Sequence, residues 1–143
     1  MNKIYLSITE AEELLPIIRK KLRRLIGINK ALSILNSLDL EYEDEYETLM
    51  QDIKINKKFH KLSFEFYNLM EELHENGCIL KDIEEGTVDF YSFFEGREIF
   101  LCWNIKEENI KYWHELECGR QCKKPVSIIK NNLARPKKEF FIR

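Results

Sequence analysis

The feature that most constrains the fold of this 143-residue chain is a change of hydrophobic period at Gly77. Before Gly77, apolar residues recur at steps of three and four, the spacing of one face of an α-helix. After it, apolar and polar residues tend to alternate, as they do in strands with one buried face. The chain is therefore predicted to have an α+β fold, with its helices first and its strands second.

Two long helices are predicted before this change of period. The first begins at Thr9, because Thr9 and Glu12 have the spacing of a capping box. The second spans residues 45–76, after a polar connection at 36–44. Long helices joined by a short connection pack antiparallel, so residues 9–76 are predicted to form a helical hairpin.

Residues 78–117 are predicted to form a small antiparallel β-meander of three to four strands. If Glu95 and Gly96 close a two-residue hairpin, residues whose numbers sum to 191 lie opposite each other. Asp89 then lies opposite Cys102 on one face of the sheet. The pairs on the other, apolar face are Phe90 with Leu101 and Val88 with Trp103.

The last segment of the meander, residues 110–117, fits either a strand or a helix. A strand is preferred because tyrosine and tryptophan suit a pleated surface, and the polar break at 106–109 suits a tight connection. Continuing the meander around this break places Cys102 opposite Trp113. His114 would then lie on the other face of the sheet from Cys102, because side chains alternate along a strand.

The composition is that of one folded domain with a basic tail. The chain is 44% hydrophobic and 34% charged, which is enough apolar material for a core. A single domain is predicted over residues 1–123, with the tail at 124–143. Residues 120–143 carry eight lysines and arginines against one acid. The tail could contact RNA or DNA, but no nucleic-acid-binding motif accompanies it, so a solvated tail is preferred.

The cytoplasm is the predicted location. No apolar run approaches the roughly 20 residues that a spanning helix needs, so no membrane association is expected. The N-terminus lacks the apolar run of a signal peptide. Four cysteines without an export signal are predicted to be reduced thiols rather than disulfides.

Several short motifs follow one another in a specific order in the second half of the chain. They are Lys81-Asp82, Val88-Asp89-Phe90, Gly96-Arg97, Leu101-Cys102-Trp103 and Trp113-His114-Glu115. With the opening Thr9 to Pro16, they resemble an uncharacterised prokaryotic family, domain of unknown function family 2203, over roughly residues 5–120. The resemblance implies a shared fold and a shared local site, and it implies no activity.

The polar and aromatic side chains of this stretch are candidates for a ligand site where the meander meets the helices. Arg97 and Lys81 suit a carboxylate or phosphate, and a tryptophan ring could stack on a planar ligand. The alternative is that Arg97 pairs with Asp89 or Glu98 and stabilises the hairpin. The predicted ligand-binding residues are Asp82, Asp89, Arg97, Cys102, Trp103, Trp113, His114 and Glu115.

Two chemical alternatives remain open for the same stretch. Zn²⁺ or another divalent metal could bind soft ligands, for which the candidates are Cys102, His114, Cys118 and Cys122. A smaller metal site would use Cys102 and His114 with Asp89 or Glu115. Cys102, His114 and Asp89 are also candidates for a nucleophile, base and orienting acid, although the predicted register separates the thiol from the imidazole.

The sequence thus predicts a ligand-binding or interaction module with its site at the β-meander. The alternative function is a small metal-dependent or cysteine/histidine hydrolase-type enzyme. The wide apolar surface of the helical hairpin is in addition a candidate homodimer interface.

Overall fold

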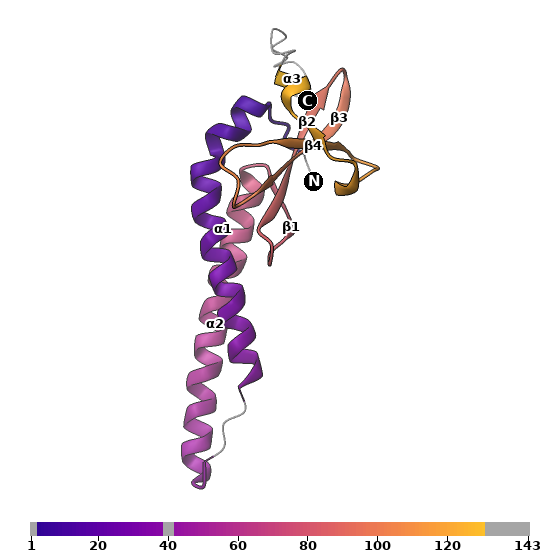
Figure 1. Cartoon of the computed structure of the whole chain (residues 1–143). Coiled ribbons are helices and arrows are strands. Elements are labelled where there is room, and N and C mark those ends of the chain that lie inside the picture. Colours follow the sequence, from indigo (N-terminus) through magenta and orange to yellow (C-terminus); the bar gives the residue numbers. More distant parts are fainter. Residues whose placement is uncertain (1–2, 39–41, 131–143) are drawn as a thin grey trace.

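Two long helices and a five-stranded antiparallel sheet make up the protein, with the sheet lying against one end of the helical hairpin (Figure 1). The computed structural model describes residues 3–38 and 42–130. Most of the predicted basic tail, residues 131–143, lies outside this described part. The predicted α+β fold with a helical hairpin is confirmed, and the sheet has one more strand than the three to four expected.

The hairpin consists of α1, Ile8–Ser37, and α2, Glu45–Glu75. The apolar stripe of α1 is buried along most of the helix. Its buried members are Ile8, Ala11, Leu15, Ile18, Leu22, Leu25 and Ile28. On α2 the buried residues are Leu62 and Leu73, both in the half nearer the sheet. The end of α1 and the start of α2 project away from the sheet (Figure 1).

The N-terminal cap of α1 is Ser7, so the predicted start at Thr9 is wrong by two residues. The Ser7 hydroxyl accepts a hydrogen bond from the Glu10 amide at 3.1 Å, and the Glu10 carboxylate accepts one from the Ser7 amide at 2.9 Å. Ser7 and Glu10 have the same capping-box spacing as Thr9 and Glu12. The Glu12 carboxylate instead accepts a hydrogen bond from the Ile110 amide, which ties α1 to the sheet.

The five strands follow chain order across the sheet: β1 Cys78–Asp82, β2 Thr87–Phe94, β3 Arg97–Asn104, β4 Tyr112–Glu115 and β5 Lys124–Pro125. The strand preferred for residues 110–117 is therefore confirmed as β4. The 3-10 turn η1, Arg120–Cys122, precedes β5, and the short helix α3, Ser127–Lys130, follows it. The first residues of the expected tail thus belong to the sheet, and the adjoining Val126 is part of the core.

The predicted register of the β2–β3 hairpin is confirmed residue by residue, with Asp89 opposite Cys102. Its turn residues Glu95 and Gly96 have φ angles of 53° and 77°. Positive φ at both positions is what a two-residue type I′ turn needs, and this turn matches the twist of the strands. A local turn therefore determines which residues of this hairpin share a face.

The predicted register of β3 against β4 is wrong by one residue. Cys102 lies opposite Tyr112 rather than Trp113. A shift of one residue turns every side chain of a strand to the other face. His114 consequently lies on the same face of the sheet as Cys102, contrary to the prediction.

The reason for this register lies in the connection between β3 and β4, which is held by α1. The Arg19 guanidinium donates hydrogen bonds to the Ile105 carbonyl and, at 2.8 Å, to the Glu107 carbonyl. The Trp103 indole donates to the same Glu107 carbonyl at 3.0 Å. These contacts and the Glu12–Ile110 bond fix how much chain the connection uses before β4 begins.

The two faces of the sheet have different partners. One face packs against α1 and forms the core, with Val88, Phe90, Ile99, Leu101, Trp103 and Trp113 as its buried members. The opposite face, which we call the outer face, includes Asp89, Tyr91, Phe100, Cys102 and His114 by strand alternation. Within the described residues, no helix combines the length and apolar character that crossing a membrane requires.

Candidate metal centre

Three side chains from three consecutive strands converge on the outer face. Asp89 comes from β2, Cys102 from β3 and His114 from β4. One ligand atom from each lies within 4.8 Å of the other two. All three residues are buried, with 1%, 4% and 3% of their surfaces exposed. A carboxylate, a thiol and an imidazole thus share one small volume.

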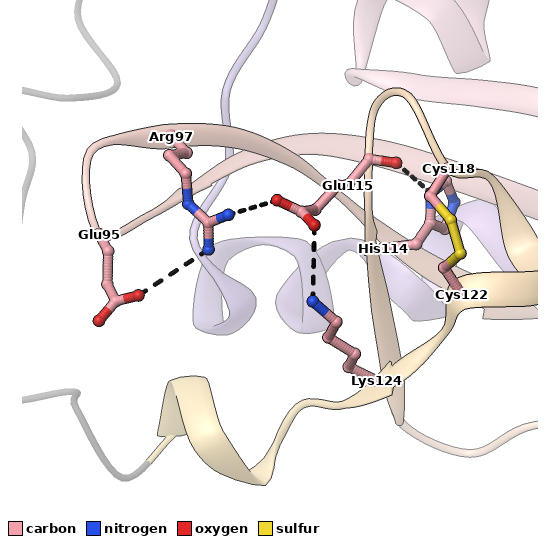
Figure 2. Close-up of polar contacts among 7 residues, drawn as sticks. All are labelled: Glu95, Arg97, His114, Glu115, Cys118, Cys122 and Lys124. Carbon is pink, nitrogen blue, oxygen red and sulfur yellow. Dashed lines mark hydrogen bonds and ion pairs between the residues drawn. A yellow bond between two sulfur atoms is a disulfide. The ribbon is translucent and has the colours of Figure 1, made fainter.

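The hydrogen bond at one ring nitrogen of His114 determines which other nitrogen could bind a metal. His114 Nδ1 lies 3.0 Å from the Glu115 backbone carbonyl (Figure 2). A carbonyl oxygen can only accept, so Nδ1 carries the proton in this contact. In the neutral ring, Nε2 then carries a lone pair, as it does in most histidines that bind a metal through Nε2.

The Nε2 atom faces the Asp89 carboxylate. It lies 3.3 Å from Oδ2 of Asp89. That distance is within the range of an ion pair, and the contact is not a hydrogen bond. Among the described residues, His114 Nε2 and Asp89 Oδ1 are buried without a hydrogen-bond partner. Leaving such a group unsatisfied costs about 1–3 kcal/mol, and a metal ion held by Asp89, Cys102 and His114 could satisfy both atoms.

The separation of the two acceptors fits a shared metal ion. At bond lengths of about 2.0–2.2 Å, two ligands of a tetrahedral Zn²⁺ lie about 3.4 Å apart. The 3.3 Å between His114 and Asp89 matches this edge. The widest separation in the cluster, at most 4.8 Å, would have to close by about 1 Å for the Cys102 sulfur to bind at about 2.3 Å.

The second thiol, Cys78, is unlike Cys102. Cys78 lies opposite Phe90 and belongs to the core on the α1 side of the sheet. Burial, and after it the negative charge of Asp89, raises the pKa of Cys78 to about 12. Cys78 is therefore a protonated packing residue at neutral pH, since only the thiolate is a good nucleophile and metal ligand.

The other two cysteines pair with each other. Cys118 and Cys122 form a disulfide, with their Cα atoms 5.8 Å apart (Figure 2). The prediction that all four cysteines are reduced is therefore wrong for this pair. Of the four metal ligands predicted from the sequence, the structure groups Cys102 and His114 with Asp89, and it joins Cys118 to Cys122 instead.

Arg97 and Glu115 belong to an exposed ion-pair network. The Arg97 guanidinium pairs with the Glu115 carboxylate and lies 3.8 Å from that of Glu95, while Lys124 lies 3.5 Å from the other Glu115 oxygen (Figure 2). The partners expected for Arg97, Asp89 or Glu98, are therefore wrong, and its observed partners are Glu95 and Glu115. Exposed pairs of this kind contribute about 0–1 kcal/mol each.

The two tryptophans lie on the other side of the sheet from the candidate metal centre. Trp103 and Trp113 are 0% and 2% exposed and belong to the core. Arg19 lies over the Trp103 ring at 4.9 Å, and Phe94 contacts Trp113 at 5.4 Å. Neither ring faces the Asp89–Cys102–His114 cluster. Asp82 is also apart from it, because its carboxylate accepts from the Glu85 amide in the β1–β2 turn.

Aromatic rings beside the cluster were not among the predicted site residues. The Phe100 ring lies 5.4 Å from the His114 ring and 4.8 Å from that of Tyr91. The Lys81 ammonium lies over Phe100 at 4.9 Å. The confirmed β2–β3 register already placed Tyr91 opposite Phe100 on the face of Asp89, so this aromatic border could have been found from the sequence.

A separate cavity of about 470 Å³ lies where α2 meets β1 and the N-terminal segment. Its lining is mainly apolar and includes none of the eight predicted ligand-binding residues. The lining residues are Lys3, Ile4, Met70, Leu73, His74, Gly77, Cys78, Ile79, Leu80 and Tyr91.

A helical hairpin packed against an antiparallel meander, with a buried Asp–Cys–His cluster on the outer face, defines a small α+β protein with a candidate metal centre. The chain belongs to the family of uncharacterized conserved proteins DUF2203, whose family model matches residues 4–126. The family predicted from the sequence motifs is thus confirmed. No curated protein and no solved structure matches the chain at a significant level.

Proposed function

We propose that this protein binds a divalent transition metal, Zn²⁺ foremost, through Asp89, Cys102 and His114. The observation that carries the proposal is the buried Nε2 of His114, which faces the Asp89 carboxylate while Nδ1 donates to the Glu115 carbonyl. Carboxylate, thiolate and imidazole are all ligands that Zn²⁺ accepts. A backbone carbonyl or carboxylate that accepts from the other ring nitrogen is the usual way in which a metal-binding histidine is oriented.

Three protein ligands leave the fourth position of a tetrahedral site for water or a small ligand. The proposed function is therefore a metal-dependent binding module whose ligand reaches the metal at the outer face. The burial of the three residues favours a ligand no larger than water or a small anion at the metal itself. Metal-assisted hydrolysis is the enzymatic form of the same site, because a bound metal lowers the pKa of its water.

A metal-free catalytic triad is less well supported by the same geometry. Such a triad needs one imidazole nitrogen for the thiol and the other for the carboxylate. Here the Glu115 carbonyl occupies Nδ1 and the Asp89 carboxylate faces Nε2. Cys102 would have to share Nε2 with Asp89, which a metal ion permits and a proton relay does not.

The first experiment measures metal content and metal binding in protein purified without a histidine tag. We expect about one Zn²⁺ per chain, and Co²⁺ in its place should give the sulfur-to-metal absorption of a thiolate ligand. Cys102→Ser should abolish that absorption, and Asp89→Asn and His114→Gln should weaken binding. The matched controls are Cys78→Ala and His74→Gln, which remove a thiol and an imidazole outside the cluster.

A second measurement separates loss of metal binding from loss of folding. A metal that binds the folded protein raises its stability, and this increase can be measured in variants that still fold. Zn²⁺ at about 100 times its dissociation constant should stabilise the wild type by about 2.7 kcal/mol. Variants that fold, as shown by circular dichroism, should lose this Zn²⁺-dependent increase in melting temperature. Equal stabilisation of the wild type and His114→Gln would overturn the proposal, and so would stoichiometric binding that survives Cys102→Ser.

Cys118 and Cys122 require a separate control experiment. The proposal includes the cytoplasm as the location, where Cys102 would persist as a thiol and the Cys118–Cys122 disulfide seen in the structure could be reduced. Reduced Cys118 and Cys122 could bind metal by themselves. The measurements are therefore repeated in a Cys118→Ser, Cys122→Ser double variant, in which the cobalt–thiolate absorption should be unchanged. Loss of this absorption in the double variant would mean that Cys118 and Cys122, and not Cys102, bind the metal, which would contradict the proposal.

A further inference from the structure

A second apolar stripe runs along α2 on the face away from α1. Its apolar members are 48–69% exposed, and His60 among them is exposed as well. The stripe consists of Tyr46, Leu49, Ile53, His60, Phe64 and Tyr67. At about 100° per residue, the stripe lies roughly 160° around the helix from the buried Leu62 and Leu73. Among residues 3–38 and 42–130, the α1–α2 packing therefore leaves these side chains exposed.

The spacing of the stripe is the same when read in either direction. The steps between its members are three, four, seven, four and three residues. As a result, the numbers of symmetric members have one common sum, 113. The three pairs are Tyr46 with Tyr67, Leu49 with Phe64, and Ile53 with His60.

This symmetry is what a twofold interface between two copies of one helix requires. In an isologous dimer, residue i of one copy contacts residue j of the other, and j contacts i. Two antiparallel α2 helices related by a twofold axis near residues 56 and 57 would bring together the residues that sum to 113. An unrelated partner would place no such condition on the spacing.

We propose that the stripe on α2 binds a second copy of this chain, with the two α2 helices antiparallel. Tyr46 of one copy would then contact Tyr67 of the other at both ends, and the aliphatic Leu49 and Ile53 would face the rings of Phe64 and His60. At about 1.5 Å per residue, the contact is about 32 Å long. This proposal concerns the hairpin alone and is independent of the metal centre, which lies on the sheet.

The area of the stripe is sufficient for a stable dimer of moderate affinity. At roughly 200 Å² for a fully exposed large side chain, the five apolar members expose roughly 600 Å² per copy. Burial of both copies removes about 1,200 Å² from water, which is the lower limit for specific interfaces. We expect a dissociation constant on the order of micromolar for an interface at this lower limit, so dilution should separate the copies.

Lys57 gives the antiparallel dimer a testable electrostatic signature. It lies in the seven-residue gap at the middle of the stripe, and the symmetry places its two copies beside the twofold axis. Like charges at this place repel, and salt screens them. We expect the dimer to tighten as salt is added, and Lys57→Ala to tighten it at low salt. Lys58→Ala, on the other side of the helix, should change the affinity little.

The first test is sedimentation equilibrium of the full chain from about 1 to about 100 µM. We expect a monomer–dimer equilibrium for the wild type. Phe64→Glu and Ile53→Glu should each weaken it by roughly a hundredfold, because a charge replaces a buried apolar group. Ile34→Glu is the matched control, since Ile34 is 61% exposed on α1 and lies off the stripe. A wild type that stays monomeric throughout, or equal weakening by Ile34→Glu, would overturn the proposal.

The second test reads the direction of the helices. Leu49→Cys and Phe64→Cys variants are oxidised separately and as a mixture. An antiparallel pair brings position 49 of one copy to position 64 of the other, so only the mixture should give the disulfide-linked dimer in high yield. Cross-linking of each variant with itself would indicate parallel helices and contradict the proposed geometry.

Discussion

The Nε2 atom of His114 lies 3.3 Å from the Asp89 carboxylate, although their strands, β4 and β2, are separated by the whole width of β3. Strands lie about 4.8 Å apart, so the two backbones are roughly 10 Å from each other. The side chains close this distance by leaning over β3, which contributes Cys102 between them. The cluster therefore exists only if all three strands present these residues on the same face.

A substitution at Gly86 tests the contact between the β1–β2 turn and the β3–β4 connection. A Cβ atom at Gly86 would lie 2.6 Å from Cγ2 of Ile105, and its φ angle is +74°. We expect Gly86→Ala to lower the free energy of unfolding by about 2–4 kcal/mol, from steric overlap and left-handed strain together. Gly96→Ala is the control, because its φ is +77° with no atom of the described residues within 4 Å of the added Cβ. Urea unfolding should give only about 1 kcal/mol for this variant.

A substitution at Ser7 tests the observed N-terminus of α1. Its hydroxyl and the Glu10 carboxylate satisfy two amides at the start of the helix. Ser7→Ala should lower the free energy of unfolding by about 1 kcal/mol. Thr9→Ala changes the residue that the sequence had suggested as the cap, and it should change the free energy by less than about 0.5 kcal/mol. Equal effects in thermal or urea unfolding would contradict the observed cap.

The raised pKa of Cys78 predicts a loss of stability in alkaline solution. Its pKa is raised to about 12 in the folded protein, against about 8.5 in an unfolded chain. Between these values the unfolded chain releases a proton that the folded protein keeps, so stability is intact below about pH 8.5 and falls as pH rises towards 12. The slope from this group is about 1.4 kcal/mol per pH unit.

The comparison with Cys78→Ala isolates this slope. Burial and the Glu98 contact also raise the pKa of Tyr5 to about 12, so the wild type and the variant share the tyrosine contribution. Urea unfolding from pH 8 to 11 should show a steeper decline for the wild type by about one proton per chain. Parallel curves would mean that the Cys78 thiol ionises normally in the folded protein.

Arg19 tests how the β3–β4 connection is held. Its guanidinium donates to the Ile105 and Glu107 carbonyls and covers the Trp103 ring. Arg19→Ala should lower the free energy of unfolding by about 1–3 kcal/mol. Faster hydrogen exchange of the backbone amides at 105–111 would locate the loss in the connection. Arg23→Ala, an exposed position one turn further along α1, should lie within about 0.5 kcal/mol of the wild type.

Much of the fold could be predicted because it depends on local patterns. The change of period at Gly77 separates helices from strands, and its φ of +81° is the left-handed conformation in which glycine commonly ends a helix. The Glu95–Gly96 turn determines the β2–β3 register, since both residues adopt positive φ. The family motifs from Val88 to Trp103 lie in this well-predicted part of the chain, whereas Trp113-His114-Glu115 lies in β4, whose register was predicted wrongly by one residue. The cap of α1 was missed because two capping-box pairs overlap, and spacing alone does not choose between them.

The candidate metal centre could be predicted only in part. Asp89 and Cys102 lie opposite each other in the hairpin, so the sequence by itself determined that they share a face. Whether His114 joins them depends on one residue of register between β3 and β4. The tertiary structure decided this, because Arg19 and Glu12 of α1 hold the connecting segment from positions about 90 residues earlier in the chain. No local turn encodes that length, and only the packing of the helix against the sheet brings the imidazole to the carboxylate and the thiol.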